Sequence, residues 1–216
     1  MSMPVECSLP LHLLGQEEFH TIDKIVMGLA FDIHNDLGRF LDERIYQDEL
    51  AHRCRGAGLN PLREVGMRIA YGDFVKNYFM DLVVADGVIY ELKACECLTS
   101  AHERQLINYL LLTGQQHGKL INFRPGSVET RFVSTKLTLA KRRVFEMDAT
   151  NWQETGSESE RLLNETTALH MSASTRHVKT YERHIRRLLH HTRLNAIQWI
   201  NFDKNHITFH TITRQS

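Results

Sequence analysis

The chain has 216 residues, which is enough for one domain with an appendage. Its 26 basic residues balance its 26 acidic residues, so no global positive field draws it to nucleic acid, and binding to a polyanion has to come from local patches. Its four cysteines do not complete a zinc-binding pattern. The sequence shows neither a signal-peptide pattern nor an apolar run of about 18 residues, which predicts a cytoplasmic protein without a membrane span.

The first part of the chain predicts two amphipathic helices after a loose arm at residues 1–15. Apolar residues at helical spacing predict one helix from residue 17 to about residue 37. A second helix is predicted over residues 41–55. On this helix Glu43 and Tyr46 lie three residues apart and therefore share a face.

Short strands and one further helix follow. Ser100 and Glu103 fit a capping box at the start of this helix, and Thr113-Gly114 marks its end. The order of elements predicts an α/β domain of mixed α+β type, in which helices flank a mixed sheet. The strands are predicted at about residues 62–71, 77–85, 88–95, 119–123 and 130–134.

Charged residues interrupt two of these apolar strands. Asp81 lies on the strand before a turn at residues 85–87. Glu91 and Lys93 lie two residues apart on the strand after the turn, and therefore on one face. Burying such charges is costly unless they pair with one another or hold a metal ion.

The register of this hairpin decides whether the three charges meet. A two-residue loop, Asp86-Gly87, would turn Asp81 away from Glu91 and Lys93. A three-residue loop at 85–87, with Gly87 in the left-handed conformation, pairs residue 84 with 88 and places Asp81 opposite Glu91. Only the second register brings the charges together, so we expect a three-residue loop.

Two carboxylates beside a lysine are typical of phosphodiester hydrolysis. The carboxylate oxygens of Asp81 and Glu91 suit Mg²⁺ or Mn²⁺, and the backbone carbonyl of Leu92 would complete the site. Such an ion lowers the pKa of a bound water and neutralises charge on the scissile phosphate. Lys93 would orient that water or help to deprotonate it.

The order of these motifs resembles that of a known nuclease superfamily. Asp81, then Glu91-Leu92-Lys93, then Gln105-x-x-x-Tyr109 is similar to the PD-(D/E)XK nuclease superfamily. With Glu43-x-x-Tyr46, the chain more narrowly resembles the small proteins named GxxExxY, from about Ile33 to Phe123. Phe40 departs from the pattern, because it stands where the name-giving glycine would be.

This resemblance implies a restriction-endonuclease-like core and a DNA or RNA substrate. It implies that Asp81 and Glu91 are metal ligands and that Lys93 is the catalytic lysine. The further site residues that it implies are Glu43, Gln105 and Tyr109. We expect Glu43 to lie within reach of the metal ion, because its helix would pack on the sheet face that bears Asp81.

A second hypothesis is a nuclease-like module that binds nucleic acid or a protein partner without cutting. The neutral net charge favours this hypothesis. Lys93 argues against it, because a module that has lost its activity has no need of that ammonium group. Cleavage of DNA or RNA that depends on a metal ion would separate the two hypotheses.

Residues 144–216 are predicted to be an extension of a nuclease-like domain at residues 1–143. A shift of 79 residues places Ile121-Asn122-Phe123 on Ile200-Asn201-Phe202, so a helix and a strand are predicted to occur twice. The second copy would be degenerate, docked on the core, and would extend its sheet. Coincidence between two unrelated helix–strand units is the alternative.

The same tail predicts a basic helix. Arg183, Arg186 and Arg187 would contact phosphates there, although a solvated helix face is the commoner explanation of such a run. A zinc site among the tail histidines ranks lower, because their spacing matches no zinc motif. A homo-oligomer is compatible with the sequence, which does not fix the oligomeric state.

Overall fold

The computed structural model describes residues 5–71, 74–136, 146–151, 160, 164, 197–203 and 206–212. The chain divides into two compact units. One unit is Pro4–Thr138, and the other comprises Met1–Met3 with Leu139–Ser216. The predicted boundary at residue 143 lies outside the described residues.

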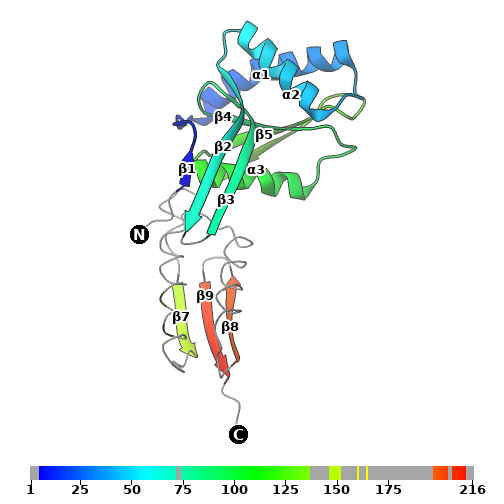
Figure 1. The fold of residues 1–216 in the computed structure, drawn as a ribbon. Helices are drawn as coiled ribbons and strands as arrows, with labels where there is room; N and C mark the ends of the chain where they lie inside the picture. Colours follow the sequence, from blue (N-terminus) through cyan, green and yellow to red (C-terminus); the bar gives the residue numbers. More distant parts are fainter. Residues whose placement is uncertain are drawn as a thin grey trace. The chain divides into compact units, whose positions relative to one another are not determined.

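The first unit holds a six-stranded mixed sheet and three helices (Figure 1). The sheet order is β1-β2-β3-β4-β5-β6, and every neighbouring pair is antiparallel except β4 and β5. This confirms the predicted α/β fold with a mixed sheet. Its elements are β1 (Val5–Cys7), α1 (Gln16–Leu37), α2 (Glu43–Gly56), β2 (Pro61–Tyr71), β3 (Phe74–Val84), β4 (Val88–Lys93), α3 (Ser100–Thr113), β5 (His117–Asn122) and β6 (Glu129–Ser134).

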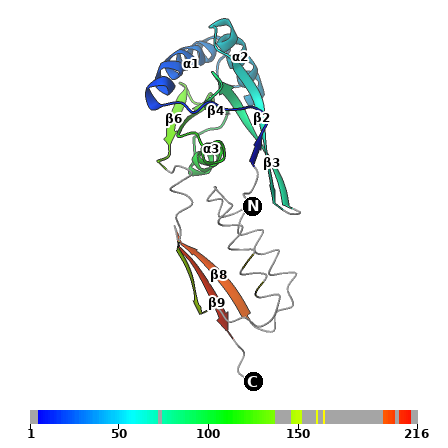
Figure 2. The ribbon, with the colours of Figure 1, turned by 90° about the vertical axis from the view of Figure 1, so that its left-hand side faces the viewer.

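The helices cover both faces of the sheet. Figure 2 shows α1 and α2 on one side of the strands and α3 on the other. Helix α3 connects the two parallel strands, β4 and β5, as a crossover connection requires. None of the helices in the described part of the chain combines the length and the apolar character that a membrane span requires.

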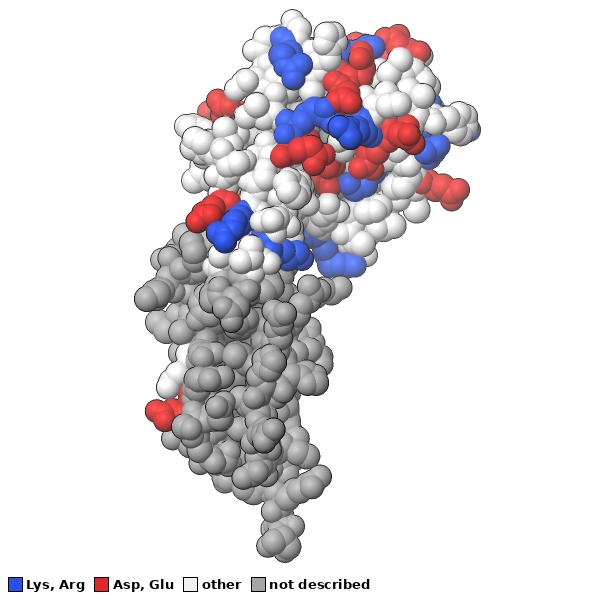
Figure 3. Space-filling view, viewed as in Figure 1, with Lys and Arg blue, Asp and Glu red and all other residues white. Residues whose placement is uncertain are grey.

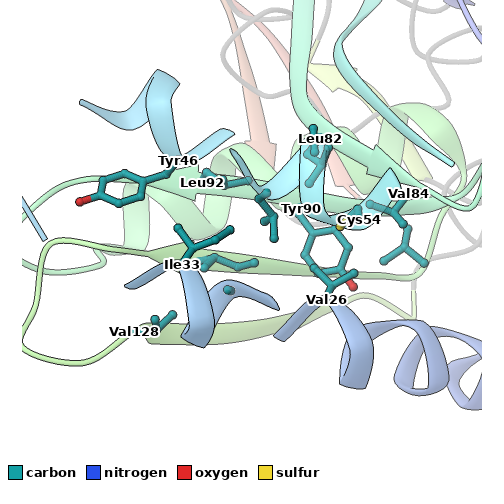
Figure 4. Close-up of a cluster of buried hydrophobic side chains, with 14 of the residues drawn as sticks. Val26, Ile33, Tyr46, Cys54, Leu82, Val84, Tyr90, Leu92 and Val128 are labelled. Carbon is teal, nitrogen blue, oxygen red and sulfur yellow. The ribbon is translucent and has the colours of Figure 1, made fainter. Parts of the chain in front are cut away.

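The main core lies between the sheet and the pair α1 and α2 (Figure 4). Tyr90 and Leu92 of β4 point into it, together with Leu82 of β3. Successive side chains on a strand alternate between faces, so Glu91 points to the opposite face, which α3 covers. Strand β4 therefore supplies apolar side chains to one layer and a carboxylate to the other.

One buried ion pair lies within the apolar stripe of α1. Asp23 is 7% exposed and pairs with Lys119 of β5. The hydroxyl of Tyr90 donates to the same carboxylate over 3.4 Å. The sequence pattern did not reveal this pair, because Lys119 and Asp23 are far apart in the chain.

The N-terminal arm is ordered from Val5, which corrects the prediction of a loose segment. Val5–Cys7 forms β1 and pairs with β2. Further along, the amide of His12 donates to the carbonyl of Asp86 over 2.7 Å, and Gln115 Nε2 donates to the carbonyl of His12. The arm thus obtains its hydrogen bonds from residues that are distant in sequence.

The N-cap of α3 lies one residue earlier than predicted. Thr99 is the N-cap, and its amide donates to His102 Nδ1 over 3.2 Å. Glu103 instead pairs with Arg131 of β6. The helix ends at Thr113-Gly114 as predicted, and Gly114, with φ of 80°, adopts the left-handed conformation.

The hairpin of β3 and β4 has the predicted three-residue loop. Val84 pairs with Val88, and the pairing continues to Leu82 and Tyr90. The positive φ angles, however, belong to Ala85 and Asp86, at 50° and 56°, and not to Gly87. The prediction of a left-handed Gly87 is therefore wrong.

Gly87 is needed for close approach instead. A Cβ atom there would lie 2.5 Å from the carbonyl oxygen of His12 and 2.8 Å from Leu14 Cδ1. The ordered arm therefore packs directly on the backbone of the hairpin turn.

In the second unit, the described strands form a sheet of their own. Its order is β7-β9-β8, with β8 antiparallel and β7 parallel to β9. The prediction that the tail extends the first sheet is wrong, because these strands pair with one another. They are β7 (Glu146–Asn151), β8 (Ile197–Asp203) and β9 (His206–Ile212).

The predicted repeat has a parallel in the register of one hairpin. Ile200 pairs with Phe209 in the same way that Ile121 pairs with Thr130, so a shift of 79 residues relates β8–β9 to β5–β6. The strand orders differ, since β7 pairs with the second strand of its hairpin and β4 with the first. The predicted tail helix lies outside the described residues, so the duplication stays a prediction.

We expect Gly87→Ala to lower the free energy of unfolding by about 1–3 kcal/mol, because the new methyl group would clash with His12 and Leu14. Hydrogen–deuterium exchange of buried amides in β4 measures this in the intact chain. Tryptophan fluorescence would not, because Trp152 and Trp199 both belong to the second unit.

Gly28→Ala is the matched control. Gly28 lies inside α1 with no atom within 4 Å of the added Cβ. Alanine should therefore stabilise the helix by about 0.5–1 kcal/mol. Equal effects of the two substitutions would contradict the packing of the arm on the turn.

Candidate functional site

The predicted metal ligands of the hairpin converge on the ammonium group of Lys93. Its Nζ lies 2.9 Å from Glu91 Oε1, 3.5 Å from Asp81 Oδ2 and 2.7 Å from the backbone carbonyl oxygen of Leu92. Three oxygens from two strands thus surround one positive charge. The side chains of Asp81 and Lys93 are 14% and 13% exposed, so the group lies near the surface but is mostly covered.

Asp81 holds this position because its carboxylate accepts a hydrogen bond from β4 just beyond the point where the backbone pairing of β3 and β4 ends. The pairing of β3 with β4 runs from Val84 to Leu82. At the next residue the carboxylate Oδ2 of Asp81 accepts the backbone N–H of Leu92 over 2.9 Å. This bond fixes Asp81 to β4 and satisfies an amide that would otherwise lack a partner.

Glu91 is the most deeply buried acid of the site, at 1% side-chain exposure. Burial raises its pKa to about 8, and the charge of Asp81 adds to the rise, while Lys93 opposes it. Its Oε2 atom has no hydrogen-bond partner among the described residues. A carboxylate oxygen that is buried and unsatisfied is costly, so this atom is suited to bind a cation or a water.

Helix α3 positions Glu91 from its covered face. Gln105 Nε2 donates to Glu91 Oε1 and lies 3.1 Å from the hydroxyl oxygen of Tyr109, one turn further along the helix. Burial, together with the charge of Glu91, raises the pKa of Tyr109 to about 12, so its hydroxyl stays neutral. Both predicted helix residues therefore lie beside the acidic group.

Glu43 reaches the site from the other layer. Its Oε1 lies 3.8 Å from Lys93 Nζ, as expected, although α2 packs on the sheet face opposite Glu91. The expected packing on the face of Asp81 was therefore wrong. Glu43 reaches across because it is the first residue of α2, and its carboxylate lies beside Lys93, the last residue of β4. Burial raises its pKa, with Lys93 opposing the rise.

Tyr46 and Gln47 hold Glu43 in place. The Tyr46 hydroxyl donates to the carbonyl of Gly38 over 2.8 Å, and its ring stacks on Phe123 at 4.4 Å between centroids. Gln47, at 4% exposure, places its Nε2 3.4 Å from Glu43 Oε1. The connection between α1 and α2 is thereby fixed, and the start of α2 with it.

A cleft of about 540 Å³ opens beside these groups. One residue in its lining, Glu64, has φ of 49° within β2, where the pairing between Arg63 and Val65 is interrupted opposite Asp81. No sequence signal identifies Glu64, because an exposed acid at an alternating strand position is usual on a solvated face. The lining residues are Glu43, Arg44, Gln47, Arg63, Glu64 and Asp81.

The donor set fits a hard divalent cation. Within the described ranges, no three side chains of His, Cys, Asp or Glu form a metal-binding group by themselves. The candidate set is instead two carboxylates, from Asp81 and Glu91, with the carbonyl of Leu92, and all three already contact a cation, the ammonium of Lys93. Oxygen donors of this kind suit Mg²⁺ or Mn²⁺.

The predicted tail sites cannot be placed beside this group. Arg183, Arg186 and Arg187 lie outside the described residues, as does His184 of the zinc hypothesis. Both hypotheses stay predictions.

Comparisons with known proteins agree with the motif order. A family model described as the PD-(D/E)XK nuclease superfamily matches residues 20–133, more than half of the chain. The match spans α1 to β6 and contains every residue of the candidate site. No curated protein and no solved structure gives a significant match.

The raised pKa of Glu91 predicts how stability depends on pH without metal. Its pKa is about 8 in the folded protein, against an ordinary value of 4.5 once unfolded. Between these values the folded protein holds a proton that the unfolded chain has released, so this group lowers stability as the pH rises. In chelator, Glu91→Gln should therefore gain stability relative to the wild type between pH 5 and pH 9, roughly the window of the two pKa values.

Protection of β4 amides in hydrogen exchange measures this difference. The two proteins are compared at equal pH, so the intrinsic exchange rate cancels. A stability difference that is constant across the window, or that moves against the variant, would show that burial does not hold the proton on Glu91.

Proposed function

Because the chain belongs to the PD-(D/E)XK nuclease superfamily, we propose that it is a metal-dependent nuclease that hydrolyses phosphodiester bonds in DNA or RNA. The observation that carries the proposal is the convergence of Asp81, Glu91 and the Leu92 carbonyl on the ammonium group of Lys93. Mg²⁺ is the proposed ion, with Mn²⁺ as its substitute. Nucleic acid is the proposed partner.

Asp81, Glu91 and the carbonyl of Leu92 would hold the ion. When bound, it lowers the pKa of the attacking water and neutralises charge on the scissile phosphate. Gln105 keeps Glu91 in place through its hydrogen bond to Oε1, and Tyr109 limits the movement of Gln105. The unpartnered Oε2 of Glu91 supports its role as a ligand.

Lys93 would act as a cation that orients the attacking water and offsets negative charge on the phosphate. Burial alone would lower the pKa of its ammonium group, but the charges of Glu91 and Asp81 outweigh burial and raise it. The group therefore keeps its proton at neutral pH, which favours orientation over proton removal. Glu43, 3.8 Å away, would hold the water or the ammonium from the side of α2.

We further propose that the chain is a GxxExxY protein within the superfamily. The contacts of Tyr46 give this motif a physical role, since its hydroxyl binds the carbonyl of Gly38 and the amide of Leu41. These bonds fix the connection that sets the position of Glu43. Phe40 is the departure from the motif.

Cleavage assays with the full-length protein test the nuclease proposal. Single-stranded and duplex DNA and RNA are incubated with Mg²⁺, with Mn²⁺ and with chelator. We expect cleavage only with metal. Asp81→Asn should abolish it through loss of a ligand, and Lys93→Met should slow it by roughly 100-fold or more.

Matched substitutions outside the site separate chemistry from general damage. Asp32 and Lys24 are exposed on α1, so Asp32→Asn and Lys24→Met should cut at the wild-type rate. A wild-type protein that binds nucleic acid but leaves every substrate intact with both metals would refute the nuclease, and would favour the non-cutting module to which the neutral net charge points.

A further inference from the structure

The connection between α1 and α2 carries an aromatic ring that the fold does not cover. Phe40 is 72% exposed, more than any other large apolar residue in the described part of the chain. Two guanidinium groups lie near its ring. The Cζ atom of Arg39 is 4.8 Å from the ring centroid, and that of Arg124 is 5.9 Å away.

Both arginines keep their charge available. Neither forms a salt bridge with a carboxylate among the described residues. Guanidinium groups bind phosphate through paired N–H donors and also stack on flat rings. An exposed aromatic ring beside two such groups offers stacking and phosphate binding at one place.

Hydrogen bonds attach this group to the candidate site. Arg124 Nε donates to the carbonyl of Ala94 over 3.3 Å, and the backbone N–H of Ala94 lies close enough to Glu43 to oppose the rise in the pKa of that carboxyl group. The amide of Phe123 also donates to the carbonyl of Lys93 over 2.9 Å. A single peptide residue, Ala94, thus separates the arginine from the acid of the site.

The surrounding surface supplies no continuous positive track. In Figure 3, basic and acidic side chains lie intermixed over the part of the first unit that carries α1 and α2. A backbone-tracking mode of binding depends on an extended basic surface. On this face, binding of a polyanion has to use discrete contacts, and stacking of a base on an aromatic ring is such a contact.

We propose that Arg39, Phe40 and Arg124 form a stacking platform that binds an unpaired nucleobase next to the scissile phosphate. The inference rests on the proposed nuclease function and specifies its substrate as single-stranded nucleic acid. A base within a duplex is already stacked on both faces and paired, so it cannot occupy the platform without being extruded. The two guanidinium groups bind the phosphates that flank the base.

Binding in chelator tests the platform without cleavage. The anisotropy of a labelled single-stranded oligonucleotide, as DNA and as RNA, is compared with that of the matching duplex. Phe40→Ala should weaken single-strand binding by roughly tenfold and duplex binding by less than about twofold. Phe40→Trp should retain binding, because indole also stacks.

Phe31→Ala is the control for loss of an exposed aromatic ring. Phe31 lies on α1 at 44% exposure, and its removal should change neither affinity. An oligonucleotide with one abasic position, moved along the strand, locates the bound base. At that position the wild-type protein should lose affinity and Phe40→Ala should lose none.

The failure of this inference differs from that of the nuclease proposal. The platform is overturned if the wild type binds no single strand, if Phe40→Ala weakens both substrates alike, or if it weakens neither. Metal-dependent cutting together with such a result leaves the nuclease in place. Loss of single-strand binding in Phe40→Ala, in a protein that never cuts, supports the platform and refutes the nuclease.

Discussion

The compensation of buried negative charge by Lys93 is the interaction on which the candidate site depends. Glu91 is almost inaccessible to water, and an isolated carboxylate in such a place is costly by several kcal/mol. Lys93 offsets part of that cost and contacts Asp81 as well. The offset is incomplete, because the pKa of Glu91 still rises to about 8. The site therefore retains an unmet demand for positive charge, which a divalent cation would satisfy.

The layered fold makes this arrangement possible. Strand β4 gives Tyr90 and Leu92 to the core beneath α1 and α2, and gives Glu91 to the layer under α3. Glu43 arrives from the first residue of α2. Two layers with different chemistry thus meet at the end of one strand, where the core stabilises the fold and the charged group stays close to solvent.

Much of this site followed from the sequence because it depends on local geometry. The alternation of β4 and the parity of a three-residue loop were enough to bring Asp81 to Glu91 and Lys93. The spacing of Gln105 and Tyr109 similarly placed both on one face of α3. Each of these inferences uses residues that are close in the chain.

The errors arose where the partner is distant in sequence. Gly87 has to be glycine because a Cβ atom there would clash with His12, and Asp23 can be buried because it pairs with Lys119. Local sequence spacing identifies neither partner. The layer that carries Glu43 was also assigned wrongly, because sequence periodicity shows which helix face is apolar but not which sheet face receives it. The cleft residue Glu64 was missed for a similar reason, since its position opposite Asp81 depends on the pairing of β2 with β3.

The hydrogen bond from the Leu92 amide to Asp81 links the register of the hairpin to the geometry of the charged group. A slip of one residue between β3 and β4 would turn Asp81 to the opposite face, and would present Met80 or Leu82 to the charged group in its place. Lys93 would then lose its contact with the Asp81 carboxylate, and the Leu92 amide would lose its hydrogen-bond acceptor. A sheet in the wrong register would therefore lose contacts at the same atoms that would carry the chemistry. The correct fold and the geometry needed for function thus depend on the same contacts.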